Sequence, residues 1–200
     1  MGISDRKERE KLEMRKRIIS AAMEMFIHDG FEKTSIRNIA EKIEYSPATI
    51  YLYYKDKDEL LYEVQGVAFA QLLDAFMNDV EGTTPIERLE GLMRTYVNFG
   101  FKHPDLYDLM FIMRSPMRAV DDEWPNCDEA FRFLISTVEP CMELLRFSNI
   151  STAALSLWTF THGLVSLHIR DRIMILGMDE EQTRALVNAA VDEYLQMIKK

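Results

Sequence analysis

Apolar residues recur at helical spacing along nearly the whole chain, and no segment shows the sustained alternation of a half-buried strand. The clearest example is a run of four apolar residues spaced i, i+3, i+4 and i+7: Ile36, Ile39, Ala40 and Ile43. This spacing places all four side chains on one face of a helix. Breaking residues are few, with 8 Gly and 6 Pro among 200 residues. The pattern therefore predicts an all-α fold of about nine helices.

Two short helices joined by a tight turn are expected before residue 60. Ser46 can cap the second of them, because its hydroxyl can accept a hydrogen bond from the first turn, and Pro47 suits the first helical position. Asp56 and Glu59 have the spacing of a capping box for a longer helix that begins at Lys57. The sequence thus predicts a helix-turn-helix near the N-terminus.

The remaining residues are expected to form a separate bundle, so we predict domains at 1–62 and 63–200. Residues 150–169 include no Asp, Glu, Lys or Arg, yet eight Ser, Thr and His residues interrupt them. That is too polar for the core of a bilayer, so no membrane span is expected. We interpret the predicted helix over 151–176 as the centre of the bundle, buried on all sides. A last helix is expected over 179–198.

Charge is distributed unevenly along the chain. The net charge is -9, but residues 1–60 contain twelve basic and twelve acidic residues and balance to zero. Residues 61–200 therefore carry the whole negative charge. Any contact with a polyanion is expected within the first sixty residues.

The two cysteines, Cys127 and Cys141, lie far apart in a chain whose first residues lack a secretory signal pattern. This usage fits a reducing cytoplasm, where both thiols would behave as small buried hydrophobic groups. A redox-active pair is the alternative. We expect a cytoplasmic protein.

The second short helix carries an unusual outer face. Ile50 and Tyr54 can point inward, onto the helix before it. Five residues then remain at the front: Pro47, Ala48, Thr49, Leu52 and Tyr53. Small residues allow the backbone to approach a DNA groove, and the hydroxyls of Thr49, Tyr51 and Tyr53 are neutral donors for phosphate oxygens. Lys55 and Lys57 add positive charge beside them.

This segment resembles the tetracycline-repressor (TetR) family of bacterial regulators. The resemblance covers about residues 15–62 and rests on Ile39-Ala40, Ser46, Thr49-Ile50-Tyr51, Tyr53-Tyr54, Lys57 and Glu59-Leu60, preceded by Ala21-Ala22, Phe26, Gly30-Phe31 and Thr34. The DNA contacts implied by the resemblance and the front face are Thr34, Ser35, Arg37, Ser46, Pro47, Ala48, Thr49, Tyr51, Leu52, Tyr53 and Lys57.

The resemblance also implies an architecture and a mode of action. Residues 1–62 would form a three-helix DNA-binding domain, and residues 63–200 a ligand-sensing and dimerisation bundle. Such a regulator, usually a repressor, binds a palindromic double-stranded DNA operator as a homodimer and is released by a small molecule. In the family the last two helices form the twofold interface, here about 151–176 and 179–198.

Two departures from the family pattern affect the expected DNA contacts. Glu44 stands where members usually have Gly, so a non-Gly residue is expected near a left-handed conformation at some cost. Pro47 and Ala48 offer no side-chain hydrogen bond. Direct readout would therefore depend on Arg37, thymine methyl groups and DNA shape.

A basic stretch at the N-terminus has two interpretations. Its cations are Arg6, Lys7, Arg9, Lys11, Arg15, Lys16 and Arg17. They can reach DNA as an arm, since they would neutralise phosphates. Acidic residues interleave with them at helical spacing, which is equally typical of a solvated helix face. Both interpretations remain open at this point.

An effector cavity is expected within residues 85–165. The chain has large apolar residues there and helix breaks at His103-Pro104, Ser115-Pro116 and Pro140. Gaps between helices are common ligand sites. The candidate lining residues are Phe99, Tyr107, Met110, Phe111, Phe131, Trp158 and His162. We expect a small apolar or amphipathic effector.

Other functions find less support in the sequence. No Gly-rich phosphate loop, nucleophile elbow or Glu-x-x-His motif occurs, so an enzyme is not expected. His162 and His168 would lie roughly 240° apart on a helix, which argues against a metal site. We expect no cofactor. A helical scaffold that binds another protein is the remaining alternative, which the front face of the second short helix disfavours.

Overall fold

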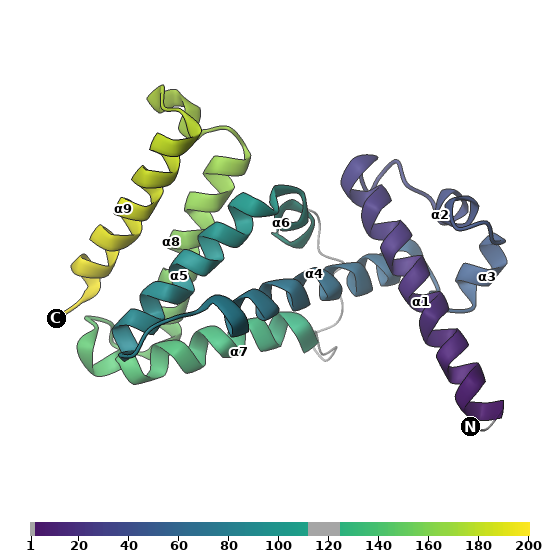
Figure 1. Ribbon diagram of the computed structural model, residues 1–200, viewed down its shortest axis with the longest axis horizontal. Helices are drawn as coiled ribbons and strands as arrows, with labels where there is room; N and C mark the ends of the chain where they lie inside the picture. Colours follow the sequence, from purple (N-terminus) through teal and green to yellow (C-terminus); the bar gives the residue numbers. More distant parts are fainter. Residues whose placement is uncertain (1–2, 112–124) are drawn as a thin grey trace. The chain divides into compact units, whose positions relative to one another are not determined.

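The computed structural model describes residues 3–111 and 125–200 (Figure 1). The α-helices in this part of the chain are α1 (Ile3–His28), α2 (Ile36–Lys42), α3 (Pro47–Tyr51), α4 (Lys57–Asp79), α5 (Pro85–Lys102), α6 (Pro104–Phe111), α7 (Pro125–Val138), α8 (Ile150–Ile169) and α9 (Glu180–Ile198). Two 3-10 helices join them, η1 (Glu139–Leu144) and η2 (Ile173–Leu176). The predicted all-α fold is confirmed.

The chain forms two compact units, and the division between them falls inside α4. Of the described residues, the first unit holds 3–68 and 108–111, and the second holds 69–107 and 125–200. The sequence prediction placed its boundary in the same helix, between residues 62 and 63.

The first unit is a small helical domain built on α1. In Figure 1, α2 and α3 lie on the same side of α1. The side chains that meet between these helices are fully buried and apolar: Ile18, Ala22, Phe26, Ile39, Ala40 and Ile50. Burying such side chains contributes roughly 1.5–3 kcal/mol each for the larger ones, which is what fixes α3 against α1 and α2.

The second unit packs α8 against α5 and α7, while α5 also contacts α9. The buried face of α8 consists of Ala153, Ala154, Leu157, Thr161 and Val165. Gly100 of α5 allows the closest approach, because a Cβ atom there would collide with the Val165 side chain. The uncharged segment is thus central to the bundle, as predicted.

Two expectations about this central helix were wrong. It is not buried on all sides, since Leu155 is 57% and Leu167 49% exposed. It also ends at Ile169 rather than near residue 176, because Asp171 adopts a left-handed conformation with φ of 55°. The amide of Asp171 donates to His168 O and that of Arg172 to Leu167 O, at 2.9 and 2.8 Å, which closes the helix in a Schellman motif.

The predicted break at Pro140 is confirmed, and it divides the predicted helix into an α-helix and a 3-10 helix. α7 ends at Val138, and Pro140 lies in the first turn of η1, where its missing N–H costs nothing. The predicted break at Ser115-Pro116 lies outside the described residues. None of the helices described is long and apolar enough to cross a membrane.

Candidate nucleic-acid interface and ligand site

α3 begins as its sequence predicts. The Ser46 hydroxyl accepts from the Thr49 amide at 3.2 Å and lies 3.0 Å from the Thr49 hydroxyl. Asp56 caps the next helix by accepting from the Glu59 amide at 2.7 Å. The Glu59 carboxylate accepts from the Lys55 amide at 2.6 Å.

The front face of α3 is open. Ile50 and Tyr54 are buried, as predicted, which turns the intervening side chains outward. Leu52 is 81% and Tyr51 56% exposed. The other front residues are either exposed, as Pro47, Ala48 and Ser46 are, or half-buried, as Thr49 and Tyr53 are.

The start of α2 contributes two further candidates from the same unit. The Ser35 hydroxyl accepts from the Asn38 amide at 3.2 Å, while the Ser35 amide donates to Asn38 Oδ1 at 3.1 Å. This capping box fixes the first turn and leaves both Ser35 and Arg37 exposed. Arg37 is the long cationic side chain at this end of α2, so it suits contact with a base edge.

Thr34 does not fit the expected role. Its side chain is only 2% exposed, and its hydroxyl donates to Gly30 O at 2.9 Å. The hydroxyl thereby fixes the corner between α1 and α2. We therefore remove Thr34 from the candidate DNA contacts.

Lys57 is half-buried and ties the start of α4 to the same corner. Its ammonium donates to Phe31 O at 2.6 Å and to Thr34 O at 2.9 Å. It also lies 4.0 Å from the centroid of the Phe31 ring, a cation–π contact. An ammonium has three donors, so one N–H remains beyond these two bonds for a phosphate.

Glu44 occupies the left-handed position that its replacement of Gly predicted, with φ of 62°. The Tyr45 amide donates to Ala40 O at 2.9 Å and the Glu44 amide to Glu41 O at 3.1 Å, which forms a Schellman motif at the end of α2. The turn before α3 thus contains a non-Gly residue in a strained, left-handed conformation.

Replacing Glu44 with Gly should raise the free energy of unfolding by roughly 0.5–1 kcal/mol, because the left-handed strain exceeds the backbone entropy that Gly loses. Denaturant unfolding measures the change. Glu41→Gly, inside α2, is the matched control and should lower stability by about 1 kcal/mol. A Glu44→Gly protein no more stable than the original would contradict the strain.

The N-terminal basic stretch is helical, because α1 already begins at Ile3. Arg6 pairs with Glu10 one turn later, at 2.8 Å. Arg15 instead reaches Glu63 of α4, also at 2.8 Å, and lies over the Tyr54 ring. Part of the stretch is therefore a solvated helix face and part connects helices within the first unit.

Three of the predicted effector-site residues meet in the second unit. Tyr107 Oη lies 2.6 Å from His162 Nδ1 and 2.9 Å from Tyr96 Oη, and Trp158 donates to Tyr96 Oη at 3.2 Å. Burial raises the pKa of both tyrosines and lowers that of His162. The cluster is therefore neutral at pH 7. Tyr96 was missed, although it lies one helical turn before Phe99.

The other predicted pocket residues are more scattered. Phe131 is 43% exposed and meets Trp158 edge-on, with ring centroids 6.2 Å apart. Met110 is buried and Phe111 half-buried at the end of α6, within the first unit. The structure therefore gathers Tyr107, Trp158 and His162, with Phe131 at the edge of the Trp158 ring, and places Met110 and Phe111 in the other unit.

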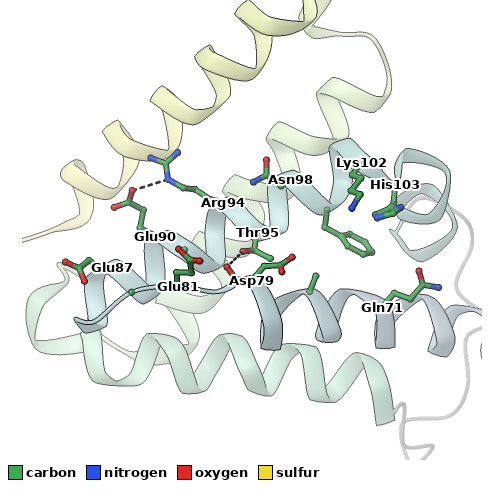
Figure 2. A pocket seen from close by; sticks show the side chains of 14 residues that line it. Gln71, Asp79, Glu81, Glu87, Glu90, Arg94, Thr95, Asn98, Lys102 and His103 are labelled. Carbon is green, nitrogen blue, oxygen red and sulfur yellow. Dashed lines mark hydrogen bonds and ion pairs between the residues drawn. The ribbon is translucent and has the colours of Figure 1, made fainter.

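A groove of about 750 Å³ lies along α4 and α5 (Figure 2). It shares Phe99 with the predicted set, and most of its other lining residues are polar or charged, among them Asp79, Glu81, Gln71, Asn98, Lys102 and His103. Two of its lining residues on α5, Arg94 and Glu90, form an ion pair with a distance of 3.0 Å between Nε and Oε1. This groove was not predicted, because it depends on how the loop after α4 lies against α5.

Comparison with known protein families identifies both parts of the chain. The family described as bacterial regulatory proteins, tetR family, matches residues 18–64. The family described as tetracyclin repressor-like, C-terminal domain, matches residues 89–194, more than half of the chain. The chain belongs to the TetR family. It is therefore a DNA-binding transcription regulator of the helix-turn-helix type and not an enzyme.

Individual proteins resemble the chain in sequence or in fold. The chain is 24% identical over 155 residues to the HTH-type transcriptional repressor KstR of Rhodococcus jostii, covering 75% of this chain and 73% of that one. A protein of unknown function from Rhodococcus sp. RHA1 shares the fold, with a TM-score of 0.76, 20% identity and coverage of 93% and 95%. So does the fatty acid degradation regulator FadR of Bacillus halodurans, with a TM-score of 0.63, 18% identity and coverage of 90% and 93%.

Proposed function

We propose that this TetR-family protein is a repressor that binds a palindromic operator as a homodimer and releases it when a small amphipathic effector binds. The exposed front of α3 carries the first part of the proposal. Ala48 and Leu52 project from it as small or apolar groups beside the Tyr51 hydroxyl, a combination suited to thymine methyl groups and phosphate oxygens. Arg37 supplies a charged donor for base edges.

Pairing of two copies is supported by the uncovered faces of α8 and α9. Leu155 and Leu167 are exposed on α8, and Leu186 and Met197 on α9. One small helix-turn-helix contacts little DNA, so specific binding calls for two recognition helices about one helical turn apart on a twofold site. Apolar side chains left in water on these two helices favour the same arrangement.

Effector binding is supported by the neutral hydrogen-bonding cluster around Tyr107 and His162. It lies beside aromatic rings, since Phe76 stacks on Tyr96 and Phe133 with centroids 6.4 and 5.5 Å apart. An effector with an apolar body and a polar head matches both features. Fatty acids are such molecules, and the FadR relative is by its title a fatty acid degradation regulator.

The helix that links sensing to DNA binding is α4, which contributes to both units. Its first two turns are fixed to the DNA-binding helices by Lys57, through Phe31 O, and by Glu63, through Arg15. A shift of α4 would therefore carry α3 with it and change the spacing of the two recognition helices. Because coupling is reciprocal, the effector must bind the DNA complex less tightly than the free protein.

Tyr107→Phe should blunt the response to effector without changing DNA affinity in its absence. A panel of saturated fatty acids from octanoate to stearate is titrated into the protein–DNA complex, and release is followed by fluorescence anisotropy. Loss of one buried hydrogen bond should raise the half-release concentration roughly tenfold.

Tyr194→Phe is the matched control, because it removes a hydroxyl that lies 2.6 Å from Ser156 Oγ elsewhere in the same unit. It should respond as the original protein does. If no fatty acid of the panel releases DNA, this effector class is wrong. If Tyr107→Phe responds normally, the effector does not contact the cluster.

A further inference from the structure

Several cations of the first unit have an internal polar partner. Arg15 and Lys42 form ion pairs with Glu63 and Glu24, at 2.8 and 2.6 Å, and Lys57 bonds two carbonyl oxygens. These side chains hold the helices together, and an acid neutralises the first two. Arg15 and Lys42 therefore add little uncompensated charge to the DNA-binding face.

Arg17 is held differently. Its guanidinium carbon lies 5.9 Å from the centroid of the Tyr45 ring, and among the residues described no carboxylate pairs with it. A cation–π contact restricts the position of a guanidinium but leaves its charge, and the N–H groups stay in the guanidinium plane, where they can donate to another group. Arg17 is exposed and Tyr45 is 41% exposed, so both are open to a large ligand.

The position of this pair follows from the helix spacing. Arg17 and Glu24 are seven residues apart and lie on the same face of α1. Glu24 contacts Lys42 at the end of α2, and Tyr45 immediately precedes Ser46, the cap of α3. This face of α1 therefore lies beside the turn that leads into the recognition helix, α3.

We propose that Arg17, positioned by the Tyr45 ring, contacts a backbone phosphate of the operator beside the groove that α3 enters. The inference rests on the proposed DNA binding and selects Arg17 from the N-terminal basic stretch, for which contact with phosphates was one of two open interpretations. A phosphate contact at this point carries no sequence information but fixes the register of α3 along the duplex. The pre-positioned, uncompensated charge is what suits Arg17 to the role.

The test is the salt dependence of binding to the operator and to an unrelated duplex. Each neutralised phosphate contributes about 0.9 to the slope of log affinity against log salt concentration. Arg17→Gln should therefore reduce the magnitude of the slope by about 1.8 in a dimer, on both duplexes. Lys16→Gln, which removes the neighbouring exposed charge on another face of α1, should leave the slope nearly unchanged.

Tyr45 variants separate positioning from charge. Tyr45→Phe keeps the aromatic face and should bind as the original protein does. Tyr45→Leu should weaken binding severalfold while the slope stays close to that of the original, because Arg17 keeps its charge but loses its fixed position.

Three outcomes would overturn the contact. The first is an unchanged slope for Arg17→Gln together with a lower melting temperature, which would make Arg17 only a link between α1 and the turn. The second is an equal loss of slope for Lys16→Gln, which would indicate a general charge effect. The third, an original protein that binds no DNA, would overturn the proposed function as well.

Discussion

Replacing Ala48 with Asp should weaken DNA binding roughly 100-fold or more while the free energy of unfolding stays nearly unchanged. Ala48 is exposed at the start of α3, so the carboxylate meets no packed side chain in the free protein. In the complex it would face phosphates, and juxtaposed like charges cost several kcal/mol. A loss of about 2.8 kcal/mol corresponds to the stated factor.

Ala48→Asn is the matched control, because asparagine has the same size and shape without the charge. It should lose much less affinity than Ala48→Asp, and the difference between the two should shrink as salt is added. Anisotropy titrations give the affinities, and denaturant unfolding verifies the fold. An Asp variant that binds like the original protein would remove α3 from the DNA interface.

Leu155→Glu should convert the proposed dimer into monomers and reduce operator affinity roughly 100-fold or more, because one recognition helix then loses the contribution of its partner. Leu155 is already 57% exposed in the single chain, so the charge is tolerated there. Burying it between two copies would leave an unpaired carboxylate in an apolar interface.

Light scattering measures the assembly. The original protein should give about twice the chain mass of 23.4 kDa, and the Leu155→Glu protein should give the mass of a single chain. Leu155→Ala is the control that shortens the side chain without adding charge and should remain mostly dimeric. A Leu155→Glu protein that stays dimeric and binds the operator fully would place the interface elsewhere.

The parts of the fold that the sequence predicts depend on neighbours in the chain. Ser46 caps α3 through an amide three residues away, and Ile50 and Tyr54 turn inward through helical spacing alone. The left-handed conformation of Glu44 was expected from the resemblance, since family members usually have Gly there, and left-handed residues are common at helix ends. The front of α3 follows from these local features.

Features that depend on distant contacts were missed. Two carbonyl oxygens far along the chain hold Lys57. Thr34 is a different case, because its hydroxyl donates to Gly30 O only four residues back, in a corner where helical spacing does not predict which side chain is buried. The polar groove exists because Gly91 lets the loop after α4 approach α5, where an added Cβ atom would lie 2.5 Å from Glu81 O. The exposed side of α8 was misjudged because an uncharged face has the same composition whether a chain's own core or a second copy covers it.

The most direct test of the central claim is selection of DNA by the intact protein from a library of randomised duplexes, followed by sequencing. The account predicts enrichment of a twofold-symmetric sequence with half-sites centred about one helical turn apart, bound by two chains. Enrichment of a single unpaired half-site bound by one chain would contradict the dimer. If no sequence is enriched from the library, the proposal that the protein recognises a specific operator would be contradicted.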